Sequence, residues 1–297
     1  MERISTFLFH QRATQGMLDN QARLSRTQIQ LATGKQILTP SDDPAGAVKS
    51  LDLQRYLASN AQFVNNMDVV RTRREQQEST LERVTDLLQR ARELAIQGNN
   101  GTTGQAARNG IAEEVDQLLE QMIALANAQD SNGEYLFGGL DRTSPAFSHS
   151  GGVVTYDGSD EQRQLQVSED RRMADGETGR AVFMGVNGAG DSAFDILGAL
   201  AQRLRSGADL SASLDDVQLA HDQVLAARMR GGARLNALDD LGNINADMAV
   251  TLESQLSEIQ DLDYAEAVAR MNRQLVALQA SQQSYAKLTQ LSLFNYL

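Results

Sequence analysis

The sequence predicts a mainly α-helical protein with a small β-rich insert (α+β), whose N- and C-terminal parts form a long helical bundle or coiled coil. Three observations support this fold class. The 297 residues include only three prolines, so most of the chain is free of helix breakers. Eleven of the 23 glycines lie within residues 131–190, which favours turns and short strands there. Elsewhere leucine, alanine, glutamine and arginine are abundant, and these residues favour helices.

The first helix is predicted over residues 5–33. Met17, Leu24 and Leu31 recur every seven residues, but the heptad positions between them are polar. Such a half-apolar stripe is too weak to fold alone, although it can pair with a partner helix. Gly34 is the expected C-cap of this helix.

Two further helices are predicted over residues 45–97 and 105–129. Ser41 or Asp43 can cap the first of them, with Pro44 in its first turn. Apolar residues then recur at steps of three and four, which is typical of amphipathic helices. Because the connection is short, we expect the two helices to form an antiparallel hairpin.

The glycine-rich insert is predicted to contain strands. Residues 153–156 and 163–167 flank a polar turn at 157–160, which indicates a β-hairpin. A further strand is predicted at 181–184. At about 50 residues, the insert is too small to expect an independent enzyme domain.

The C-terminal part returns to a helical pattern. Ser192 with Asp195, and Ser213 with Asp216, resemble capping boxes in which aspartate replaces glutamate. A long helix is predicted over residues 214–260.

A last helix is predicted to begin at Asp263, with Glu266 three residues later as its capping partner. No acidic residue follows Glu266. Both ends of the chain therefore carry heptad-like stripes and little acid.

These patterns divide the chain into five parts. We expect an N-terminal assembly helix that is disordered in the free monomer, a helical hairpin of the core, a β-rich insert, long C-terminal helices of the core, and a C-terminal assembly helix. Their predicted ranges are 1–40, 41–139, 140–190, 191–260 and 261–297.

Charge and composition exclude several classes of protein. The net charge of −12 disfavours a nucleic-acid binder, because phosphates require a basic face. The chain has no cysteine, which excludes disulfides, thiolate nucleophiles and cysteine-ligated metals. No stretch reaches the roughly 18 apolar residues of a membrane span. The apolar run near Phe7 is shorter than the roughly 7–15 residues of a secretory signal, so we expect no cleaved signal peptide.

The sequence predicts no catalytic, cofactor-binding or metal-binding residue, and the protein is expected not to be an enzyme. His10, His149 and His221 are scattered and have no metal-ligand spacing. The acidic residues around Asp157 and Asp160 lack the periodicity of a calcium loop, and a polar turn explains them better.

Several motifs occur in one order along both helical parts. The segments read LATGKQI, SDDPAG, LQRARELA, NGT, EYLFGG and QLSLF, and they begin at Leu31, Ser41, Leu88, Asn100, Glu134 and Gln290. On these motifs the chain resembles the flagellin family of bacterial flagellar axial proteins, over about 240 residues.

The resemblance implies a secreted structural protein of the bacterial flagellum, active in motility and located outside the cell. It implies type III export without a cleaved signal, and termini that pair as an α-helical coiled coil in the innermost tube. The implied partners are other copies of the chain in a ring, hook-associated protein 1 on the hook side, flagellin on the filament side and a flagellar export chaperone. No nucleic acid, membrane insertion or cofactor is implied.

Within the family, three details favour a subunit that joins hook to filament over the filament subunit itself. These are the start at Arg3-Ile4-Ser5-Thr6, the ending from Ser292 to Leu297, and the short insert. The alternatives are flagellin, and a soluble enzyme or sensor whose helices support an unidentified site on the β-rich insert.

We predict that apolar residues near both ends form the assembly interface. They could instead form only an intramolecular core, but their place at the extreme termini favours contacts between copies. The predicted residues are Ile4, Phe7, Met17, Leu24, Leu31, Val268, Met271, Leu275, Leu278, Leu288, Leu291 and Phe294.

Overall fold

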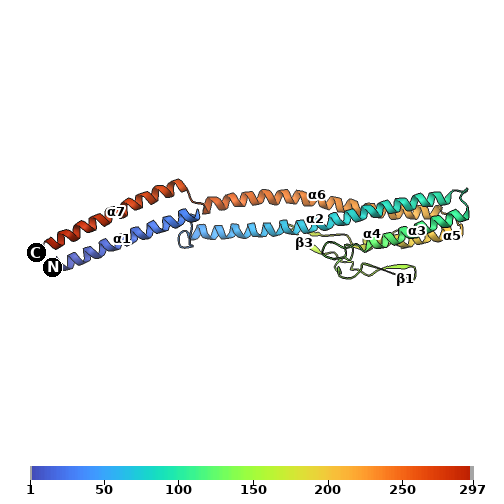
Figure 1. Ribbon diagram of the computed structural model, residues 1–297, viewed down its shortest axis with the longest axis horizontal. Helices are drawn as coiled ribbons and strands as arrows, with labels where there is room; N and C mark the ends of the chain where they lie inside the picture. The colour runs from blue at the N-terminus through green and yellow to red at the C-terminus, as the bar shows by residue number, and fades with distance from the viewer. Residues whose placement is uncertain (1, 295–297) are drawn as a thin grey trace. The chain divides into compact units, whose positions relative to one another are not determined.

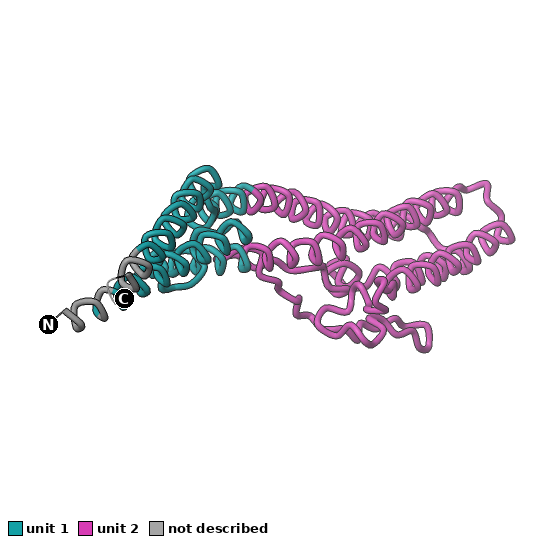
Figure 2. Tube along the Cα trace, turned by 60° about the vertical axis from the view of Figure 1, so that its left-hand side comes forward, with its two compact units in different colours: residues 1–59, 247–297 teal, residues 60–246 magenta. Residues whose placement is uncertain are grey.

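The computed structural model describes residues 2–294 and divides into two compact units. Unit 1 contains residues 1–59 and 247–297, and unit 2 contains residues 60–246 (Figure 2). Unit 1 therefore combines the two ends of the chain, and unit 2 contains its middle.

Long helices dominate the structure, and a small β-rich region interrupts them, so the predicted fold class is confirmed (Figure 1). In chain order the elements are α1 (Glu2–Thr33), α2 (Pro44–Asn99), α3 (Gln105–Ala126), β1 (Phe147–Ser150), β2 (Val153–Tyr156), β3 (Gln164–Gln166), β4 (Arg172–Ala174), α4 (Gly179–Phe183), α5 (Ala193–Ser206), α6 (Ser211–Gln260) and α7 (Tyr264–Phe294).

In unit 1, α1 ends and α2 begins at the capping residues that the sequence predicts. Gly34 has φ of +69° and donates its N–H to Gln30 O, as a C-cap requires. The Asp43 carboxylate accepts the N–H groups of Ala45 and Gly46 at 3.1 and 3.0 Å, so Asp43 rather than Ser41 caps α2.

Short backbone contacts join the two loops of unit 1. Gln36 N–H donates to Gln260 O at 2.7 Å, and Leu262 N–H donates to Gly34 O at 2.9 Å. The end of α1 and the start of α7 are thereby held together, and α1 and α7 lie side by side along the rest of their length (Figure 1).

In unit 2 the parts of α2, α3, α5 and α6 that it contains surround one large apolar core. Arg90 on α2 pairs with Glu114 on α3 at 2.7 Å, as expected for the predicted antiparallel hairpin. Where the β-rich region meets the helices, four phenylalanines pack with ring centroids 5.1–5.5 Å apart, and they are Phe137, Phe147, Phe183 and Phe194. This aromatic cluster fastens the insert to the helical core.

The predicted pairing of the strands is wrong. Residues 153–156 form a strand, but it pairs with β1, in the register Phe147↔Tyr156. Gly151 and Gly152, with φ of +62° and +84°, make the tight turn between them. The strand near residues 163–167 is β3, and it pairs with β4 instead.

The predicted strand at 181–184 is also wrong, because this segment belongs to the short helix α4. Thr178 caps that helix by accepting the Ala181 N–H. One helical turn places Val182 and Phe183 together in the core, where both are fully buried. An apolar run this short does not distinguish a strand from a buried helical turn.

The two predicted capping boxes have different outcomes. Ser192 caps α5: its Oγ accepts the Asp195 N–H at 3.1 Å, and the Asp195 carboxylate accepts the Ser192 N–H at 2.9 Å. The prediction for Ser213 and Asp216 is wrong, because α6 already begins at Ser211 and Ser213 is buried within it.

Substitution of Ser192→Ala should lower the free energy of unfolding by about 1–2 kcal/mol, because a buried cap of α5 is lost. Urea denaturation followed by circular dichroism measures the change. Ser206→Ala, at the exposed other end of α5, is the control and should change stability by at most about 0.5 kcal/mol. Equal losses in both variants would contradict the capping role.

Candidate assembly surface

In the paired helices α1 and α7, six of the twelve predicted assembly residues are buried or half-buried. Leu24 is buried against α7, and Met17, Leu31, Met271, Leu275 and Leu278 are half-buried. The His10 ring meets the Tyr285 ring edge-on at 5.7 Å. Val268 points away, with an exposed fraction of 43%. The side chains of Ile4, Phe7, Leu288, Leu291 and Phe294 lie outside the described residues.

Unit 1 also exposes large apolar side chains that the sequence analysis did not select. They are Leu8, Leu18, Ile29, Val48, Leu51, Tyr56, Met248, Val250, Tyr264 and Val276. Apolar side chains gathered on an exposed surface mark sites of contact with other molecules. The heptad stripe did not predict them, because it covers one face of α1 and of α7 only. Val48, Leu51 and Tyr56 lie on α2, and Met248 and Val250 lie on α6.

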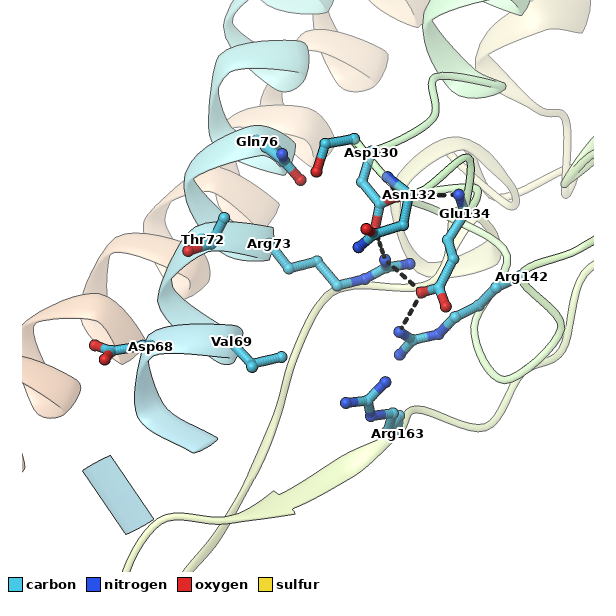
Figure 3. Close-up of a pocket in the computed structure, with 11 residues that line it drawn as sticks. Asp68, Val69, Thr72, Arg73, Gln76, Asp130, Asn132, Glu134, Arg142 and Arg163 are labelled. Carbon is cyan, nitrogen blue, oxygen red and sulfur yellow. Dashed lines mark hydrogen bonds and ion pairs between the residues drawn. The ribbon is translucent and has the colours of Figure 1, made fainter. Parts of the chain in front are cut away.

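A buried network of ion pairs holds the insert on α2 in unit 2 (Figure 3). Arg73 is buried, pairs with Asp130 at 3.1 Å, and donates to Tyr135 O at 2.7 Å. Arg142 pairs with Glu134 at 2.9 Å and with Asp175 at 2.5 Å. The network thus connects α2 to the segment that follows α3, through Asp130 and Glu134, and to the insert, through Arg142 and Asp175.

The arginines of this region have shifted pKa values. Burial, followed by the nearby Arg142, lowers the pKa of Arg73. Burial and the nearby Arg234 lower the pKa of Arg74 to about 10, although Glu177 opposes the shift. Burial acts against the charge of Arg142, but hydrogen bonds to Asp175 and Glu134 raise its pKa.

A cavity of about 380 Å³ adjoins the network (Figure 3). Its lining carries charges of both signs, from Arg73, Arg142 and Arg163 and from Asp68, Asp130 and Glu134. Because the buried members pair with one another, we interpret the network as an anchor for the insert. None of the residues of this network was predicted from the sequence. Arg73, Arg74 and Gln77, at helical spacing from Val70 and Leu81, are the signal that could have identified buried polar residues.

The other candidate residues form no site. Asp160 pairs with Arg180, and His221 lies 3.4 Å from Asp222. Among the described residues, no group of histidine and acidic side chains is arranged to hold a metal ion. Among the same residues, no helix combines the length and apolar composition needed to cross a membrane.

Comparison with known proteins defines the class. The bacterial flagellin N-terminal helical region matches residues 4–141, and the bacterial flagellin C-terminal helical region matches residues 215–297. The chain belongs to the flagellin family, and the resemblance predicted from its motifs is confirmed.

Within the family, the chain is similar to flagellar hook-associated protein 3 of Escherichia coli, with 29% identity over 314 residues and 98% of both chains covered. The protein of the same name from Salmonella typhimurium is 26% identical, with the same coverage. Among solved structures, a putative flagellar hook-associated protein from Vibrio parahaemolyticus aligns with a TM-score of 0.68 and 24% identity, over 74% of this chain and 100% of that one. This structural likeness supports the fold.

Proposed function

We propose that this protein is a structural subunit that joins the hook of the bacterial flagellum to its filament. The observation that carries the proposal is the similarity to hook-associated protein 3 along 98% of both chains. A match over the full length includes both terminal helices and the insert between them. The proposal assigns no chemical reaction to the chain.

The structure supports a mechanism of assembly through the chain ends. Pairing of α1 with α7 leaves apolar side chains such as Leu18, Ile29 and Val276 in solvent. Burial of such side chains against neighbouring copies stabilises an assembly by roughly 25 cal/mol per Å² of apolar surface. We propose that the terminal helices are disordered in the free monomer and form a coiled coil when copies gather in a ring.

The proposed partners follow from this role. Hook-associated protein 1 is the proposed neighbour on the hook side and flagellin on the filament side, with an export chaperone binding the chain before secretion. We propose that the protein leaves the cell through the flagellar export channel without a cleaved signal and works outside it.

Deletion of the gene should release flagellin into the medium instead of retaining it on cells, because the filament would lack its attachment. Immunoblots of cells and medium measure the ratio. The full chain should restore retention, whereas a chain without residues 1–33 and 264–297 should not, although it stays folded by circular dichroism. Normal retention in the deletion strain would contradict the proposal. Purified protein that grows long filaments by itself would favour flagellin instead.

A further inference from the structure

We propose that the end of α6 in one copy docks in parallel along α7 of a second copy, through matched rows of acidic, apolar and basic side chains. This inference rests on the proposed assembly function and names the surfaces that neighbouring copies use. All the residues that carry it lie in unit 1.

The outward face of the α6 end is acidic. Asp247, Val250 and Glu258 are exposed, and Asp261 is exposed directly after the helix. At 3.6 residues per turn, positions 0, 3, 11 and 14 fall on one side of a helix. The half-buried residues of this segment, including Leu252, Leu256 and Ile259, fall on the other side. Residues 247–263 contain five acidic residues and no basic residue.

The outward face of α7 is basic. Arg273, Val276 and Lys287 are exposed and lie at positions 0, 3 and 14 of one face. The opposite face contains Leu275 and Leu278, which are half-buried. Residues 267–294 contain three basic residues and no acidic residue.

The two faces have the same spacing with opposite charge. If Asp247 is set beside Arg273, then Val250 meets Val276 and Asp261 meets Lys287, and the two charge pairs lie about 21 Å apart at 1.5 Å per residue. Parallel helices preserve this register along their whole contact. Antiparallel helices would place the valines at opposite ends.

None of the four charges in the two proposed pairs is neutralised by an ion pair within its own chain. Asp247, Asp261, Arg273 and Lys287 have no ion-pair partner among the described residues. The Asp261 carboxylate accepts a hydrogen bond from the Ser257 hydroxyl, which is neutral and leaves its charge uncompensated. Val250 and Val276 have exposed fractions of 66% and 65%, the two highest among the large apolar side chains described. Each face therefore lacks oppositely charged and apolar partners in its own chain, and the other face offers both.

Only a second copy can bring the faces together. Within unit 1, α7 continues in the direction of the α6 end and does not fold back along it (Figure 1). The matched residues are 26 positions apart, which corresponds to roughly 40 Å along helices. A copy displaced in that direction places its α6 end beside α7 of the first. Such a head-to-tail contact uses two different surfaces and repeats from copy to copy, which generates rings or helical tubes.

Cysteine cross-linking tests the contact, because the chain has no cysteine of its own. Full-length Val250→Cys and Val276→Cys variants are co-expressed in cells that lack the native gene, and isolated flagella are oxidised. We expect disulfide-linked dimers in which peptide mass spectrometry identifies the mixed 250–276 link. Met229→Cys, at a position that is also 63% exposed, replaces Val250→Cys in the control pair. A yield of the 250–276 link no higher than the control would overturn the inference.

Charge reversal provides the second measurement. Arg273→Glu with Lys287→Glu should lower the yield of the link at least about fivefold, because two attractive pairs become repulsive. Asp247→Lys with Asp261→Lys in the partner chain should restore it. Absence of rescue in variants with normal circular dichroism would overturn the proposed register. If flagellin stays on the cells while the link is absent, only this inference fails. If the native chain does not restore retention of flagellin, the proposed function fails.

Discussion

Replacement of Arg73 with methionine is expected to lower the free energy of unfolding by about 3–5 kcal/mol, because it leaves the buried Asp130 carboxylate without its cation and removes one of the cations beside Asp175. The Arg73 side chain is only 6% exposed, and Asp130 and Asp175 beside it are 9% and 4% exposed. The substitution also leaves the Tyr135 carbonyl oxygen without its side-chain donor. Urea denaturation, with circular dichroism as the signal, measures the loss.

The control for this prediction is Arg71→Met, two residues earlier on α2. Arg71 pairs with Asp239 at 2.6 Å, but the pair is open to solvent. A surface ion pair contributes about 0–1 kcal/mol, so this variant should remain close to the native stability. If the two variants lost the same amount, the insert would not depend on the buried network.

Substitution of Leu278→Asp is expected to reduce incorporation of the protein into flagella by at least about 100-fold. Leu278 lies on the inner face of α7 with Leu275, where α1 packs. An unpaired charge placed in an apolar interface costs several kcal/mol, and 1.4 kcal/mol corresponds to a factor of ten. Quantitative immunoblots of isolated flagella measure the change.

The Gln279→Asp variant adds the same charge at the next position, which is exposed, and it should be incorporated nearly as well as the native chain. Circular dichroism of both purified variants should show that unit 2 remains folded. Normal flagellar content of the Leu278 variant would contradict the predicted role of this residue in assembly.

The helical framework was predictable because its signals are local. Asp43 before Pro44, Ser192 with Asp195, and Asp263 before α7 each mark a helix start through one side chain and its next turn. Gly34 marks an end in the same way. These signals do not depend on the rest of the fold, so α1, α2, α5 and α7 begin or end close to the predicted residues.

The insert was less predictable because its structure depends on distant partners. The segment 153–156 has a turn signal on both sides, and sequence alone does not select between the hairpins. The choice follows from burial of Phe147 among the other phenylalanines of the core, which only β1 can provide. Likewise, the role of Arg73 depends on carboxylates about 60 and 100 positions away.

The outward faces of α7 and of the α6 end were not predicted from the sequence, for a related reason. The heptad pattern selects residues that pair within the two terminal helices, such as Leu24, and ignores the opposite side. Val250 and Val276 became noticeable only when the structure showed both of them in solvent. Whether the predicted apolar residues bind neighbouring copies remains a prediction.

The tight turn between β1 and β2 is a suitable site for inserting a label into this protein. Gly151 and Gly152 have no neighbouring atoms within 4 Å of where a side chain would begin, so the turn has room around it. A short epitope or a fluorophore-binding peptide inserted there would leave both chain ends native, whereas a terminal fusion would alter the helices through which we propose that the protein assembles. Live imaging of the joint between hook and filament would therefore start from residues 151–152.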